Sequence, residues 1–201
     1  MFNSGMTVAN FITALNSEVD ISQTISDSTI LRWVSSLEQL LYDDIIRFEK
    51  GQDVTDDLDN DAFLFSDLDV GANEQAPDFG DVLKVFCDGV ELTKSGPIAG
   101  FQFHTDKQIY CETSGGIKIY PFDSPAEVYV MWRVKPKIKT ATSEYIYMPY
   151  EWIDLVFAKL RGECYKLAND DSQAAKWLAD YNAQLESFKV WVEEHQKRFG
   201  E

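Results

Sequence analysis

The sequence predicts an α+β fold, a discontinuous helical bundle that carries an inserted small antiparallel β module. Three observations lead to this prediction. Apolar residues recur at helical spacing near both ends of the 201-residue chain, short strand-like runs fill its centre, and an acidic stretch joins the two patterns. Because each amphipathic helix needs a partner for its apolar face, the two ends are expected to pack together. The expected division is a helical domain of 1–50 and 149–201, an acidic loop or arm of 51–81, and a β module of 82–148.

Two helices are expected before residue 50. The first covers residues 6–17, where four apolar side chains share one face: Val8, Phe11, Ile12 and Leu15. The second follows the N-cap oxygens of residues 26–28 and continues as an apolar stripe from Ile30 to Phe48. Gly51 is expected to end it.

Residues 51–81 form the acidic arm, with ten acidic residues and no lysine or arginine. They are expected to form a long surface loop in which Phe63–Phe65 is a short apolar anchor. The spacing of its aspartates suggests a calcium loop, but Ala62 and Leu68 stand where an EF-hand needs glycine and a bidentate glutamate. A solvated loop is therefore favoured over a metal site. The densest acidic run supplies the candidate residues of a charged channel or arm: Asp53, Asp56, Asp57, Asp59 and Asp61.

The central region is expected to form a small antiparallel sandwich or barrel. Asp88-Gly89 lies between two strand-like runs and is a signal for a type I′ hairpin turn. Residues 101–104, 109–113 and 144–148 are further strand candidates. Residues 127–134 alternate with period two, which places Val128, Val130, Trp132 and Val134 on one face.

Two antiparallel helices are expected after Pro149, separated by the break at residues 169–171. Four aromatic side chains lie partly outside their narrow apolar stripes and are candidate anchors of a protein–protein interface: Trp152, Tyr165, Trp177 and Trp191. A wider core contact within the chain explains them about as well.

The composition argues against several functions. A net charge of −16 disfavours general nucleic-acid binding and an anionic membrane surface, and no apolar run reaches the length of a membrane span. No phosphate-binding glycine loop, nucleophile elbow or metal-ligand spacing occurs, so no enzyme activity, cofactor or metal is expected. The three cysteines are expected to be reduced thiols. The basic cluster of residues 133–139 is interpreted as a protected edge strand and loop, with contact to DNA or an acidic partner as the alternative.

Three segments carry a resemblance to a known family. LRWVSSLEQLLYDDII (31–46) is a helix rich in Leu, VFCDGVEL (85–92) belongs to a central β insertion, and 144–188 holds a proline-started helix and a last helix with the pair Tyr181-Asn182. This layout resembles the head-to-tail connector (adaptor, or neck) proteins of tailed bacteriophages, over most of the chain except the acidic arm. The resemblance implies a structural virion protein whose subunits form a ring below the portal, continue the DNA channel and join head to tail.

The resemblance also implies partners and a location. It implies a homo-oligomer, expected as a dodecameric ring, that contacts the portal protein and tail or neck proteins in the virion neck after assembly in the host cytoplasm. DNA would pass through without specific binding, and no membrane is involved. Negative charge on the channel wall suits such passage, although acidic surfaces also aid solubility.

Two other classes of function stay open. One is a receptor- or carbohydrate-binding β module on a helical stalk, which would use strand aromatics such as Phe101, Phe103, Tyr110 and Tyr120. The other is a small hydrolase whose site is assembled from distant residues.

Overall fold

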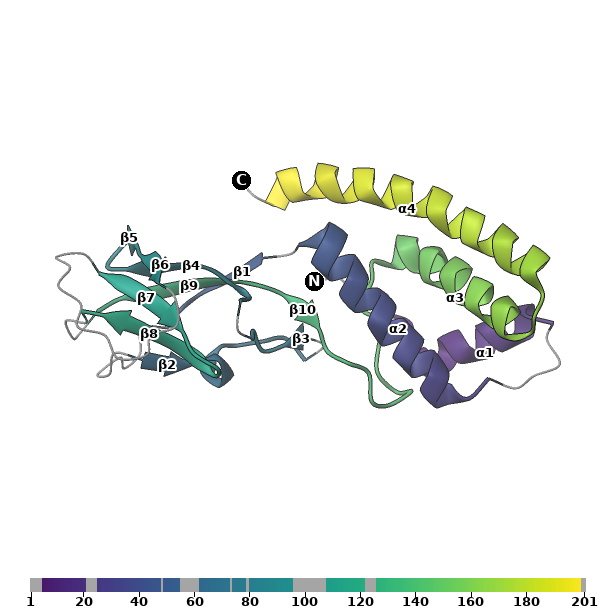
Figure 1. Cartoon of the computed structure of the whole chain (residues 1–201), viewed down its shortest axis with the longest axis horizontal. Helices are drawn as coiled ribbons and strands as arrows, with labels where there is room; N and C mark the ends of the chain where they lie inside the picture. The colour runs from purple at the N-terminus through teal and green to yellow at the C-terminus, as the bar shows by residue number, and fades with distance from the viewer. Residues whose placement is uncertain are drawn as a thin grey trace. The chain divides into compact units, whose positions relative to one another are not determined.

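Figure 1 shows the computed structural model of the chain, which describes residues 5–20, 25–47, 49–54, 62–72, 74–78, 80–95, 108–121 and 126–199. The chain forms two compact units. Met1–Ile46 and Pro136–Glu201 make a helical unit from both chain ends, and Arg47–Lys135 make a β unit inserted between them. The predicted α+β class, a discontinuous helical bundle with an inserted β module, is confirmed.

The described residues of the helical unit form four α-helices and two short helical turns. In chain order they are α1 (Val8–Glu18), α2 (Asp27–Leu41), the π-helical turn η1 (Tyr42–Ile46), the 3-10 turn η3 (Tyr150–Trp152), α3 (Ile153–Leu167) and α4 (Asp171–Phe199). Side-chain oxygens cap the first two helices. The Thr7 hydroxyl accepts a hydrogen bond from the Asn10 N–H at 3.2 Å, and the Ser26 hydroxyl accepts one from the Thr29 N–H at 3.3 Å.

The second helix ends earlier than the sequence indicated. It changes to π-helical hydrogen bonding after Leu41, and Arg47 adopts a left-handed φ of 43° that stops the helix. Gly51, expected as the helix stop, lies instead in a β-strand. The predicted stop was wrong because the helical turns end at Ile46, and Gly51 pairs with Met131 of the neighbouring strand β9 (Val128–Arg133) instead.

Contacts between the two chain ends build the helical core. Phe11 of α1 stacks on Phe157 of α3, with ring centroids 4.1 Å apart, and Glu18 forms an ion pair with Arg161. The helices α3 and α4 lie side by side (Figure 1), joined where Asn169 takes a left-handed φ of 57°. This packing explains why α1 and α2 fold with helices that follow them by more than a hundred residues.

In the described part of the β unit, the strands form two four-stranded sheets with the orders β1-β9-β4-β5 and β2-β8-β7-β6, and β3 pairs with β10, whose first residue ends this unit. Neighbouring strands in the two larger sheets are antiparallel, apart from the parallel pair β6 and β7. The strands are β1 (Glu49–Asp53), β2 (Ala62–Leu64), β3 (Glu74–Gln75), β4 (Val82–Cys87), β5 (Val90–Glu91), β6 (Thr93–Ser95), β7 (Ile109–Glu112), β8 (Gly116–Tyr120), β9 (Val128–Arg133) and β10 (Lys135–Pro136); the 3-10 turn η2 (Phe65–Asp67) follows β2.

One apolar core joins the two sheets. Val130 and Trp132 of the first sheet and Ile117 and Ile119 of the second belong to it, together with Phe63 from the acidic stretch. The predicted inward face of residues 127–134 is confirmed, since Val128, Val130 and Trp132 of β9 and the following Val134 are all buried. The predicted turn is confirmed as well, because Asp88 and Gly89 have φ values of 50° and 76° between the paired strands β4 and β5.

The boundaries of the parts differ from those expected. Residues 51–81 are not one continuous loop, because β1, β2 and β3 pair with strands of the β unit. Residues 136–148, expected in the β module, belong to the helical unit. The strand expected at 144–148 is absent from these described residues, where only an isolated bridge joins Tyr145 to Thr7. The strand expected at 101–104 lies outside the described residues.

Candidate functional site

Two of the four candidate interface aromatics lie in one cluster within the helical unit. The Trp152 ring lies 5.1 Å from Phe188 and 6.0 Å from Trp191, and the Trp191 ring stacks on His195 at 4.0 Å. His195, one of only two histidines, is thus held against an aromatic ring. These contacts join η3 to the second half of α4, so both tryptophans contribute to packing within the chain.

The other two candidate aromatics are half-buried on the α3–α4 pair. The Arg161 guanidinium lies 4.5 Å above the Trp177 ring, a cation–π contact, while Tyr165 lies one turn further along α3. An intersubunit role for these four residues stays a prediction, and most of their apolar surface already has partners inside the chain.

Of the five candidate acidic residues, the described chain includes one. Asp53 is exposed at the end of β1, directly opposite Tyr129 of β9. Asp56, Asp57, Asp59 and Asp61 lie outside the described residues.

Asp53 belongs to a sheet face that points away from the core. Here we call it the outer sheet face, formed by side chains of β1, β9, β4 and β5. Strand register places Asp53, Tyr129, Phe86 and Glu91 in one row across the sheet. A second row runs through Gly51, Met131 and Lys84. The opposite face of the same strands carries the buried core residues.

A hollow of about 380 Å³ lies on this face. Its lining is Asp53, Phe86, Gly89, Glu127, Tyr129 and Met131, and we call it the acidic hollow. The rings of Phe86 and Tyr129 are 6.0 Å apart and inclined by 58°. Both rings and Met131 are only half-buried, so the hollow offers apolar surface to a ligand.

A glycine outside the lining leaves room for one of the rings of the hollow. The Tyr129 ring lies across Gly51, where a Cβ atom would come within 1.8 Å of the tyrosine hydroxyl oxygen. Any other residue at position 51 would therefore displace the ring. The close approach of Tyr129 explains why a strand with little β propensity carries a glycine at its centre.

Negative charge at the hollow is not neutralised within the described part of the chain. Asp53 and Glu127 are exposed, and no ion pair reaches either carboxylate among the described residues. The buried acids of the same unit each have a lysine: Glu74 pairs with Lys50, Asp81 with Lys135 and Glu112 with Lys94. The hollow is thus suited to an apolar group that carries positive charge.

The aromatics proposed for a carbohydrate site lie elsewhere. Tyr110 is only 2% exposed and belongs to the core of the β unit, so its expected exposure was wrong. Tyr120 is half-buried beside Lys118, and Phe101 and Phe103 lie outside the described residues. Sequence reasoning missed Tyr129 and Met131, although the alternation in β9 places both opposite the predicted inward face.

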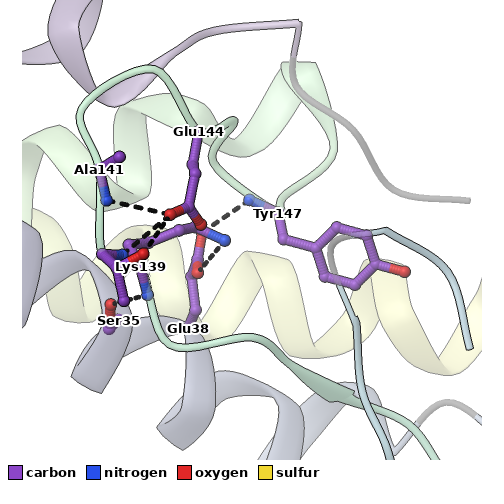
Figure 2. A network of polar contacts seen from close by, with 7 residues as sticks. Ser35, Glu38, Lys139, Ala141, Glu144 and Tyr147 are labelled. Atoms are coloured by element: carbon purple, nitrogen blue, oxygen red, sulfur yellow. Dashed lines mark hydrogen bonds and ion pairs between the residues drawn. The ribbon is translucent and has the colours of Figure 1, made fainter.

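A network of buried polar contacts (Figure 2) holds the segment 137–149 on α2. The Lys139 ammonium lies 3.0 Å from a Glu38 carboxylate oxygen, and both side chains are fully buried. The Tyr147 N–H donates to Glu38 at 2.6 Å, and the Lys139 N–H donates to the Ser35 hydroxyl at 2.9 Å. Burial raises the pKa of Glu38 to about 7, against the opposing attraction of Lys139.

A second carboxylate folds this segment onto itself. Glu144 accepts hydrogen bonds from the Thr140 N–H and hydroxyl, each at 2.9 Å, and from the Ala141 N–H at 3.0 Å. Burial raises the pKa of Glu144, but these hydrogen bonds lower it by more, so the pKa lies below its ordinary value.

Part of the positive charge in the basic cluster of residues 133–139 is neutralised by ion pairs, since Lys135 and Lys139 have buried carboxylate partners. Lys137 and Ile138 stay exposed between them.

Two further properties concern the described residues only. No helix there is long and apolar enough to cross a membrane. No group of three or more His, Cys, Asp or Glu side chains there is placed to hold a metal ion.

Comparison with models of known protein families found no match, and comparison with curated protein sequences found none.

Proposed function

We propose that this chain is a head-to-tail connector (adaptor) subunit, a structural virion protein that forms a ring below the portal, continues the DNA channel and joins head to tail. The observation that carries the proposal is the architecture. A helical unit is made from both chain ends, and a β unit is inserted between them. This is the layout on which the resemblance to phage connectors rests.

The segments behind the resemblance adopt the elements that the layout requires. Residues 31–46 form most of α2 and all of η1, and residues 85–92 contain the end of β4, the turn and all of β5. Pro149 precedes η3 and α3, and Tyr181 of α4 is buried. These matches support the proposal as agreement in architecture.

The charge distribution also supports it. A subunit of net charge −16 repels the phosphates of DNA, as a channel wall must if DNA is to slide. The basic cluster offers little compensation, because Lys135 and Lys139 form ion pairs with Asp81 and Glu38. DNA would thus pass without being held.

The test is whether the purified chain assembles. Size-exclusion chromatography with light scattering, over a range of concentrations and with the portal protein of the same phage, is expected to show a ring or a ring–portal complex. Negative-stain images should show a central channel, and duplex DNA should not be retained at low salt. A chain that stays monomeric alone and with the portal would refute the proposal.

One observation favours a second candidate function. The acidic hollow combines aromatic rings with carboxylate acceptors, which are also the groups that bind sugars. This candidate is a receptor- or carbohydrate-binding β module on a helical stalk. Specific glycan binding by a monomeric chain, abolished by Tyr129→Ala, would favour it over the connector.

A further inference from the structure

We propose that the acidic hollow of one copy receives Lys137 and Ile138 of a neighbouring copy. This inference rests on the proposed ring and names the contact between adjacent subunits. We call Lys137 and Ile138 the basic loop. The acidic hollow belongs to the β unit, and the basic loop belongs to the helical unit.

The hollow has the chemistry of a site for a cation attached to an apolar group. Phe86, Tyr129 and Met131 offer half-buried apolar surface, and burying such surface favours a contact. The two aromatic rings favour a cation over their faces. Asp53 and Glu127 supply two exposed carboxylates without an ion pair in the described part of the chain.

The basic loop has the complementary chemistry. Ile138 is 54% exposed, and its neighbour Lys137 is exposed with no ion pair among the residues that the structure describes. Arg32 is exposed too, and it lines a second hollow of about 360 Å³ together with Ile138. An exposed apolar side chain is thus accompanied by two cations.

Other exposed apolar residues beside a lysine do not share this feature. Leu167 and Val190 are exposed, but the adjacent lysines are already paired: Lys166 lies 3.4 Å from Glu163, and Lys189 lies 2.7 Å from Glu186. Their charges are partly neutralised within the chain. This contrast selects the basic loop as the partner of the acidic hollow.

The network in Figure 2 holds the loop in place before any contact forms. Lys139 directly follows Ile138, and both its backbone N–H and its ammonium are fixed on α2, by Ser35 and Glu38. Pro136 precedes Lys137 and restricts the backbone there. Because the loop is already ordered, little conformational entropy is lost when it docks.

The contact has the symmetry that a ring needs. Each copy uses two different surfaces, its hollow for one neighbour and its loop for the other, so the contact is heterologous. Repetition of a heterologous contact gives a ring when the rotation closes, whereas a two-fold dimer uses the same surface twice.

Charge reversal with mixing tests the contact. The hollow-reversed variant carries Asp53→Lys and Glu127→Lys, and the loop-reversed variant carries Arg32→Glu and Lys137→Glu. All four side chains are exposed, so circular dichroism is expected to show native folding. Each variant alone should lose the ring peak in light scattering, with a dissociation constant raised at least about tenfold by like charges in contact.

Mixing the two variants in equal amounts should restore the ring, because the basic hollow now meets an acidic loop and the acidic hollow meets a basic loop. An even-numbered ring accommodates this alternation. The control Glu193→Lys with Glu194→Lys makes the same charge change on exposed residues of α4 and is expected to leave assembly intact. Raised salt should weaken the wild-type ring.

A cysteine cross-link gives an independent measurement. The variant Glu127→Cys with Lys137→Cys should form disulfide-linked ladders under mild oxidation, and neither single variant should do so. If the wild type forms rings and each charge-reversed variant does as well, the contact is wrong and the ring stands. If both variants fail and the mixture also fails, or no ladder forms, the contact is refuted. A wild-type chain that never assembles refutes the ring and the contact together.

Discussion

Replacing Lys139 with methionine is expected to destabilise the helical unit strongly at pH 8 and much less at pH 5. Lys139 is the buried partner of Glu38, with the two charged groups 3.0 Å apart. Methionine keeps most of the apolar length of the side chain and removes the charge. At pH 8 the Glu38 carboxylate would stay buried without its cation, and breaking one side of a buried ion pair costs about 3–5 kcal/mol.

The pH dependence follows from the pKa of Glu38. Burial raises it from 4.5 to about 7, so the folded state binds this proton more tightly than the unfolded state does. Protonation of Glu38 therefore adds to the free energy of unfolding. This contribution is complete below pH 4.5, the ordinary pKa, and it is lost as the pH rises through about 7. At pH 5 Glu38 is protonated in the wild type as well, so the variant removes no ion pair there, and its expected cost is about 1 kcal/mol or less.

The assay is urea unfolding followed by circular dichroism at the helical band, at pH 5 and pH 8. The loss of stability in the variant should be larger at pH 8 than at pH 5 by about 2–4 kcal/mol. Adding Glu38→Gln should recover most of the loss, since the glutamine carbonyl still accepts from the Tyr147 N–H. Lys189→Met, at a partly exposed lysine in a surface ion pair, serves as control and should change stability by less than about 0.5 kcal/mol. Equal losses at the two pH values would refute the reasoning.

Three further outcomes are expected. Gly51→Val should cost about 1–2 kcal/mol by displacing the Tyr129 ring, and this cost should vanish in a Tyr129→Ala background, as measured by urea unfolding. Gly162→Ala should destabilise the α3–α4 packing by about 1 kcal/mol because a Cβ would lie 2.8 Å from Leu178, and it should become stabilising once Leu178 is alanine. The native protein should react with no thiol reagent at pH 8, because all three cysteines are buried and burial raises the pKa of Cys164 to about 11.

Each outcome has a control. Gly115→Val is matched to Gly51→Val, and since a Cβ at Gly115 meets no atom within 4 Å, its effect should be small. For the helix pair, the sign of the Gly162→Ala effect must reverse between the two backgrounds; the same sign in both would count against the close contact. For the thiols, unfolding in urea should release all three, and rapid labelling of the native protein would contradict their burial.

Features set by neighbouring residues were predictable from the sequence. The N-cap at Ser26, the turn at Asp88-Gly89 and the buried alternation of β9 each depend on side chains within a few positions, and the structure contains all three. The α+β class with an inserted β unit followed from the same local patterns. Connector function stays a proposal, because it rests on an architecture and not on a chemical signature.

Features that depend on partners distant in sequence were not predictable. The segment Glu49–Asp53 has no strand pattern of its own and becomes β1 because it pairs with β9. The candidate acid Asp53 was found by composition, but only that pairing places it beside Tyr129 and Phe86 in a hollow. Likewise, the sequence does not distinguish the lysines of the basic cluster, whereas in the folded chain Lys139 is buried against Glu38 and Lys137 is exposed.

The sequence alone determined which segments are helical, extended or acidic, since backbone preference and periodicity are local. The tertiary structure decided which charges are neutralised and which aromatic rings stay accessible, because both depend on burial and on contacts between segments far apart in the chain.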